Sequence, residues 1–123
     1  MKYIIELPFR LPSFNQYSDI ERRNKFEASN FKKGIQGDII WAIRKAKPPK
    51  IYKPVKITFT WIEKNKKRDL DNIFSAKKFI LDALVKEGIL QNDSQKYVTG
   101  LTDRIEHDKL RGDRIIVEID EVE

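Results

Sequence analysis

Val55-Lys56-Ile57-Thr58-Phe59-Thr60-Trp61-Ile62 is the stretch that most clearly indicates the fold. Apolar residues at its odd positions alternate with a lysine, two threonines and a final isoleucine, which is the period of a strand with one face on a core. Helical patterns lie before and after this strand in the sequence. The chain is therefore predicted to form a mixed α/β domain.

The helix before the strand is predicted from about Glu27 to Ala46, because apolar residues recur there at three- and four-residue steps. Pro48-Pro49 ends it. The second helix is predicted from Asn72 to about Lys86, with Gly88 as a left-handed C-terminal cap. At about 100° per residue its polar face holds Asp71, Ser75, Lys78 and Asp82, and its apolar face holds Ile73, Ala76, Ile80, Ala83 and Leu84.

The remaining segments complete the predicted order βαβαββ. Strands are expected at Tyr3–Leu7, Tyr97–Ile105 and Arg114–Glu121, with the polar turn His107–Asp113 joining the last two and an extended, turn-rich loop at Leu11–Tyr17. This order predicts one α+β domain over residues 1–123, with a mixed β-sheet covered by two helices. The aromatic residues assigned to its core are Trp41, Phe59, Trp61 and Phe79.

Composition narrows the classes of function. The 123 residues carry a net charge of +6 and a pI of about 9.5, which favours a polyanionic partner but would also suit an acidic membrane or protein. The absence of cysteine excludes disulfides and thiolate metal sites, and the single histidine, His107, excludes a histidine cluster. No signal peptide or membrane span is recognisable, so we expect a cytoplasmic protein with no membrane partner.

The segment Lys66-Lys67-Arg68-Asp69-Leu70-Asp71-Asn72 has the features of a metal site. If strand-like geometry persists to this point, both carboxylates project the same way. A third acid, Asp93, follows the second helix. Carboxylates suit Mg²⁺ or Mn²⁺, and Mg²⁺ usually leaves positions to water and substrate phosphate. We therefore predict a metal held by Asp69, Asp71 and Asp93, beside Lys66, Lys67 and Arg68 as contacts to a phosphodiester backbone.

Each aspartate, taken alone, could also have a purely structural role. Asp71 or Asn72 could be an N-cap, Asp69 a loop acid paired with Arg68, and Asp93 another cap or a turn residue. The joint pattern favours a metal site. The alternative hypothesis, from another functional class, is a non-catalytic nucleic-acid-binding protein in which the acids hold a structural cation. Acids on a phosphate-binding surface weaken affinity unless a metal neutralises them, so their clustering favours the enzyme.

The same residues resemble the RusA family of Holliday-junction resolvases. The resemblance rests on Lys67-Arg68-Asp69-Leu70-Asp71-Asn72, on Lys78 and Asp82-Ala83-Leu84 in the following helix, and on Asn92-Asp93. The amino-terminal segment Pro12–Tyr17 is also similar to the Pro-Ser-x-Asn-x-Tyr segment of that family. The likeness covers most of the chain and is most specific at the central motif.

This resemblance implies a Mg²⁺-dependent endodeoxyribonuclease without an organic cofactor, found in bacteria and prophages. It would act as a homodimer that resolves four-way DNA junctions in recombination and repair. Asp69, Asp71 and Asp93 would be the catalytic, metal-binding acids and Lys78 the active-site lysine. The stretch before the lysine looks about three residues longer than in the family, which leaves Lys77 as an alternative, although helical phase favours Lys78. Nuclease action on other branched DNA is the alternative activity.

Overall fold

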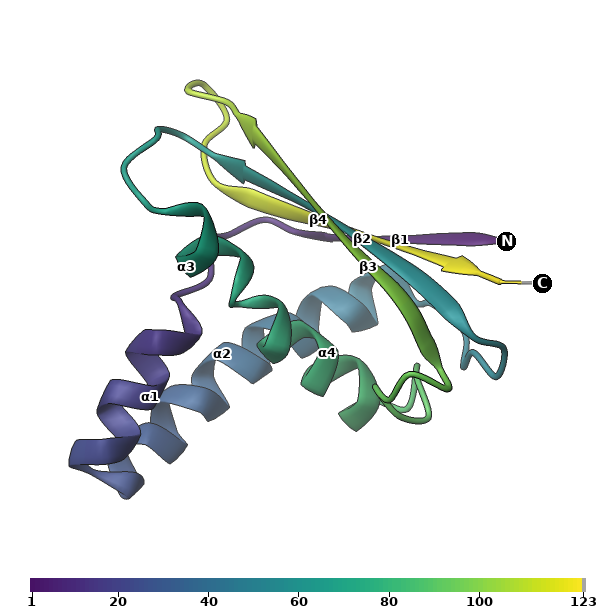
Figure 1. The fold of residues 1–123 in the computed structure, drawn as a ribbon, viewed down its shortest axis with the longest axis horizontal. Helices are drawn as coiled ribbons and strands as arrows, with labels where there is room; N and C mark the ends of the chain where they lie inside the picture. The colour runs from purple at the N-terminus through teal and green to yellow at the C-terminus, as the bar shows by residue number, and fades with distance from the viewer. Residues whose placement is uncertain (123) are drawn as a thin grey trace.

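The computed structural model describes residues 1–122 and shows one four-stranded mixed sheet with helices against it (Figure 1). The elements are β1 (Lys2–Leu7), α1 (Phe14–Arg23), α2 (Lys25–Ala46), β2 (Val55–Glu63), α3 (Leu70–Phe74), α4 (Lys77–Lys86), β3 (Val98–His107) and β4 (Arg114–Glu121). The predicted mixed α/β class and all four predicted strands are therefore confirmed. The helices are more numerous than predicted.

The sheet order is β1-β4-β2-β3. β2 pairs with β3 in parallel and with β4 in antiparallel orientation, so α3 and α4 form the crossover between the two parallel strands. The successive strands β3 and β4 are separated in the sheet by β2. Their connection crosses the end of β2, where the Asp108 backbone N–H donates to the Glu63 carbonyl at 3.0 Å and the Lys64 N–H donates to Asp113 Oδ1 at 2.7 Å.

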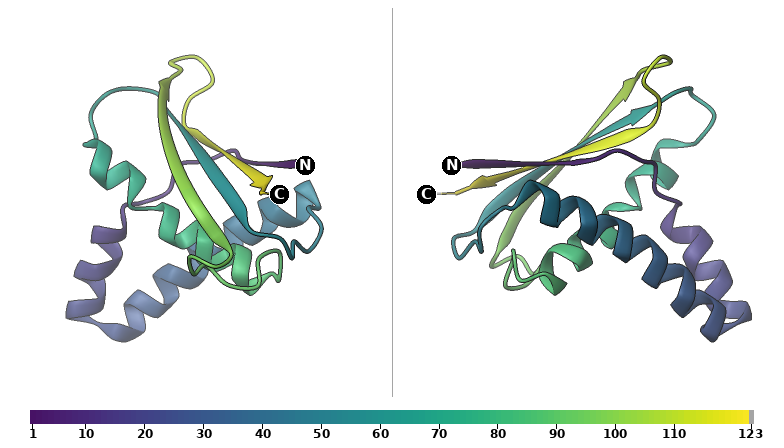
Figure 2. Two further views of the ribbon diagram at one scale, coloured as in Figure 1. Left: turned by 45° about the vertical axis from the view of Figure 1, so that its right-hand side comes forward. Right: turned by 180° about the vertical axis from the view of Figure 1, so that it is seen from behind.

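The core lies between the sheet and the helices, which cover one of its faces (Figure 2). Phe59, Trp61 and Phe79 are at most 2% exposed, as predicted from the sequence. The prediction for Trp41 was wrong, since its side chain is 53% exposed. Ala42 and Ile43, the next residues of α2, are buried in the core instead, and a step of about 100° per residue turns the tryptophan away.

Helix α1 replaces the predicted loop from Phe14 onward. Ser13 is its N-cap: its side chain accepts the Gln16 N–H at 3.2 Å, and the Gln16 side chain accepts the Ser13 N–H at 3.1 Å. This reciprocal pair is a capping box, a signal that Ser13-x-x-Gln16 carries in the sequence. Asn24 then ends α1 and caps α2, so a single residue separates the two helices.

The predicted helix from Asn72 to Lys86 is two helices, with α3 beginning at Leu70 and α4 at Lys77. Its predicted apolar face is confirmed, because Ile73, Ala76, Ile80, Ala83 and Leu84 are all buried. Within residues 1–122, none of the helices combines the length and apolar character required to cross a membrane.

Candidate active site

The acidic pair lies where the loop after β2 becomes α3. β2 ends at Glu63, Asp69 is the N-cap of α3 and Asp71 lies in the first turn, so the strand-like geometry expected here does not persist. Within residues 1–122, the Asp69 side chain makes no capping hydrogen bond, and Asp71 Oδ1 accepts only the N–H of the next residue, Asn72, at 3.0 Å. Both carboxylates are exposed and retain free oxygen atoms.

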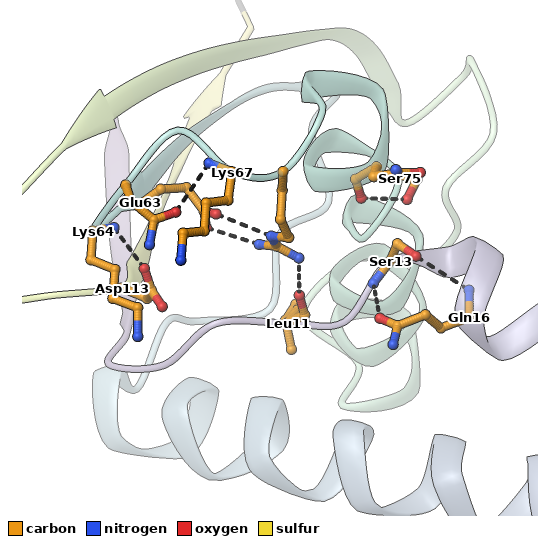
Figure 3. A network of polar contacts seen from close by, with 11 residues as sticks. Leu11, Ser13, Gln16, Glu63, Lys64, Lys67, Ser75 and Asp113 are labelled. Carbon is orange, nitrogen blue, oxygen red and sulfur yellow. Dashed lines mark hydrogen bonds and ion pairs between the residues drawn. The ribbon is translucent and has the colours of Figure 1, made fainter.

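Arg68 holds this loop to two other parts of the chain, at Glu63 and Leu11, which are labelled in Figure 3. Its Nε and Nη2 atoms donate to Glu63 Oε1 and Oε2 at 3.0 and 2.8 Å, and Nη1 donates to the Leu11 carbonyl at 2.9 Å. Glu63 is only 6% exposed. The predicted phosphate contact of Arg68 stays a prediction, because its guanidinium uses three of its five N–H groups on the Glu63 carboxylate and the Leu11 carbonyl and has two left. Lys66 and Lys67 are exposed and form no ion pair within residues 1–122, so their predicted role stands as a prediction.

The amino-terminal segment packs against the same loop and helix. The Phe14 N–H donates to Ser75 Oγ at 3.0 Å, and Asn15 Nδ2 donates to Asn72 Oδ1 at 3.0 Å. Ser75 Oγ in turn donates to the Asn72 carbonyl at 2.8 Å. The two sequence segments that resemble the RusA family are thus joined in space. Together with Arg68, these bonds fix both ends of the segment that presents the acidic pair.

Lys78 connects the polar face of α4 with the predicted third acid. Its Nζ atom lies 3.1 Å from Asp82 Oδ1 and 3.3 Å from Asp93 Oδ2. The hydrogen bond that Lys78 donates to Asp82 is the main cause that raises the pKa of Lys78 above its ordinary value of 10.5. Burial, the next largest effect, lowers this pKa, and the charge of Asp82 together with the hydrogen bond and charge of Asp93 raise it further. The ammonium group is therefore positive throughout the neutral range.

Lys77 lies in a different environment. Its ammonium pairs with Asp103 of β3, 5.9 and 5.8 Å from the ring centres of Phe59 and Phe74. Asp103 also accepts a hydrogen bond from Trp61 Nε1 at 2.9 Å. Sequence reasoning did not identify this half-buried pair. The signal in the sequence was that Asp103 alternates with Leu101 and Ile105 along β3, so its side chain lies on the same face of the strand as these apolar residues.

No group of three histidine, cysteine, aspartate or glutamate side chains is arranged to hold a metal ion within residues 1–122. Convergence of Asp93 on the acidic pair therefore stays a prediction. The pair itself fits a divalent ion, because Asp69 and Asp71 offer exposed hard oxygen donors with few internal partners. Mg²⁺ commonly takes one or two protein carboxylates and completes its shell with water and substrate phosphate.

These features describe a class of protein: a basic α/β domain with carboxylates and unpaired lysines on one exposed loop, as in enzymes that act on nucleic acids. Comparison with protein families makes the assignment specific. A family model described as endodeoxyribonuclease RusA matches residues 13–120, nearly the whole chain, so the chain belongs to the RusA family of endodeoxyribonucleases. A search of curated proteins finds no match.

Proposed function

We propose that this protein is a Mg²⁺-dependent endodeoxyribonuclease that resolves four-way DNA junctions in the cytoplasm, in recombination and repair. The observation that carries the proposal is the position of Asp69 and Asp71, exposed on a segment that Arg68, Asn72 and Ser75 tie to the rest of the fold. Membership of an endodeoxyribonuclease family supports the class of reaction. Fixed catalytic geometry of this kind is what phosphodiester hydrolysis requires.

Asp69 and Asp71, joined by Asp93, are the residues that would hold Mg²⁺, with Mn²⁺ as the natural substitute. When bound there, the ion supplies positive charge at the scissile phosphate and lowers the pKa of a water molecule. Lys78 contributes from the chain itself. Because its pKa is raised, it stays protonated and can stabilise the negative charge that develops on the phosphate oxygens.

Lys66 and Lys67 bind the phosphates next to the one that is cut, which positions the DNA without reading its sequence. We further propose that the protein acts as a homodimer. A four-way junction has approximate twofold symmetry, and an isologous dimer presents two equivalent sites to opposed strands. Paired cleavage by one dimer would then leave two nicked duplexes.

The first experiment is Asp71→Asn assayed on a labelled mobile four-way junction in Mg²⁺, with junction binding measured in parallel. We expect cleavage to fall by at least about a hundredfold, the usual effect of losing one group that stabilises transition-state charge, while binding changes little. Asp38→Asn is the matched control, because Asp38 is an exposed acid of α2 in no ion pair within residues 1–122. Cleavage by Asp71→Asn at the wild-type rate would contradict the assignment.

A non-catalytic nucleic-acid-binding protein is the second candidate, and one observation favours it. Asp93 pairs with Lys78 in the structure, as a purely structural acid would. That candidate predicts junction binding that does not depend on metal and no cleavage with Mg²⁺ or Mn²⁺. Forks, flaps and linear duplex should be assayed beside the junction, since equal rates on forks and four-way junctions would favour a general nuclease for branched DNA.

A further inference from the structure

A cavity of about 330 Å³ lies against the loop that carries the acidic pair, and Arg68 and Leu70 are among the residues that line it. Ile73 of α3 and Ile105 of β3 provide apolar walls, and Leu70 lies between the two acids in sequence. Asn65, Lys66 and His107 supply polar groups around the same space. The cavity therefore joins the loop that carries Asp69 and Asp71 to the end of β3, which is an edge strand of the sheet.

Leu70 is the first unusual feature of this place. The helix buries Ile73, but Leu70 is 50% exposed and lines the cavity. An exposed apolar side chain between two charged residues adds nothing to the core. Proteins that distort DNA use such side chains as wedges, inserting leucine or isoleucine between neighbouring bases.

The polar groups of the cavity are the second feature. Lys66 and His107 make no side-chain hydrogen bond or ion pair within residues 1–122, and the Asn65 amide nitrogen is likewise free while its oxygen accepts the Lys67 N–H at 3.0 Å. The charged residues of the lining, Lys66 and Arg68, are both positive. Arg68 is immobilised by Glu63, so the wall that it forms is fixed before any ligand arrives.

We propose that this cavity receives one unstacked nucleobase from the branch point, next to the phosphate that is cut. The inference rests on the proposed function, because it names the part of the DNA that the same site holds. The isoleucine walls and Leu70 would contact the faces of the base, Asn65 and His107 would bond to its edge, and Lys66 would meet its phosphate. Unstacking a base costs least where pairing is already interrupted, which favours branched over linear DNA.

The test uses four-way junctions in which 2-aminopurine replaces one adenine, because this base becomes more fluorescent when it leaves the stack. The wild-type protein is added in chelator, so that the signal reports binding without cleavage. We expect fluorescence to rise about threefold or more for a probe at the branch point, in line with removal of one base from its stack. A probe in the middle of an arm should not respond.

Variants connect the signal to the cavity. Leu70→Ser and the double change Asn65→Ala with His107→Ala should abolish the increase, and Leu70→Ser should weaken junction binding about tenfold. Leu101→Ser is the matched control, since Leu101 is 44% exposed on β3 but does not line the cavity. Circular dichroism spectra would show that every variant keeps the wild-type fold.

Two results would overturn the inference: no increase at any branch-point position when the junction is saturated, or an increase that persists in both cavity variants. Failure of the proposed function looks different, because it is the absence of cleavage of any branched DNA in Mg²⁺ or Mn²⁺. Cleavage without a fluorescence change would contradict base binding in the cavity and support the nuclease activity. A fluorescence change without cleavage would support base binding and contradict the nuclease activity.

Discussion

The Arg68–Glu63 pair gives Arg68 a structural role that its neighbours in sequence do not indicate. Arg68 follows two lysines, and the run predicts a phosphate-binding strip. In the structure Glu63 is 6% exposed and its two carboxylate oxygens accept hydrogen bonds from Arg68, so the arginine stabilises the fold and positions the acidic pair. A charged group this buried needs a partner, which a solvent-exposed lysine does not.

Arg68→Gln is therefore expected to lower the free energy of unfolding by about 2 kcal/mol. This is less than the roughly 3–5 kcal/mol lost when a fully buried pair is broken, because the Arg68 side chain is 20% exposed to solvent. Urea denaturation followed by circular dichroism measures the effect. Lys66→Gln in the same loop is the control and should stay within about 0.5 kcal/mol of wild type. Unchanged stability together with lost junction binding would show that Arg68 acts mainly as a DNA contact.

Lys77 and Lys78 have different surroundings in the structure, and helical phase alone did not predict the partners of either lysine. Lys78 is on the polar face with Asp82 and Asp93, while Lys77 is between the aromatic rings of Phe59 and Phe74. The partners that raise the pKa of Lys78 favour its protonated form, so their contribution is lost only as the pH rises through that raised value. Its positive charge is thus available over the whole range in which a nuclease works.

Among the helices, α1 depends most on its capping interactions for stability. None of its residues is buried, and it has Ser13 and Gln16 in a capping box and two rings, Phe14 and Tyr17, 5.3 and 6.0 Å from the ring of Phe79. A helix of this length has little stability of its own in water. Its first turn also carries the Phe14 N–H that binds Ser75, so the cap stabilises a contact of the candidate site.

Ser13→Ala should therefore cost about 1 kcal/mol of unfolding free energy, the usual loss when an N-cap hydroxyl is removed. Faster hydrogen exchange should appear in α1 before it appears in α2. Ser18→Ala, in the middle of α1, keeps the cap and serves as the control. If exchange in α1 is unchanged by Ser13→Ala, the helix is held by its packing on Phe79 and the capping box contributes little.

Local patterns in the sequence predicted the strands and the buried face of the second helix well. Alternation located β2 to within one residue, and the apolar face of the second helix is buried as expected. Two errors came from reading periodicity without end signals: α1 was missed although Ser13-x-x-Gln16 was present, and the break before α4 was not foreseen. Trp41 was assigned to the core by residue type, although its neighbours Ala42 and Ile43 occupy that direction.

Strand order and contacts between residues far apart in the sequence were much harder to predict. Nothing in β3 or β4 shows that β2 separates them, since strand order depends on how the crossover packs. The acids were identified from residue type and spacing, and Lys78 from the resemblance to the RusA family together with its phase on the helix; the structure does bring Lys78 to Asp93. The contact of Arg68 with Leu11 and the ties from Asn15 and Phe14 join residues 57 to 61 positions apart, which no local pattern records.

The protein as a whole carries a net charge of +6, so junction binding must weaken as salt rises. Each lysine that contacts a phosphate contributes to the slope of log binding constant against log salt concentration. The double variant Lys66→Gln/Lys67→Gln should reduce that slope by about two, one for each lost phosphate contact. Lys50→Gln/Lys53→Gln removes the same charge from exposed positions before β2, at the opposite end of that strand, and should leave the slope nearly unchanged. Equal slopes for the two double variants would mean that general charge attracts the DNA, and that the loop of the acidic pair does not lie on the phosphate backbone.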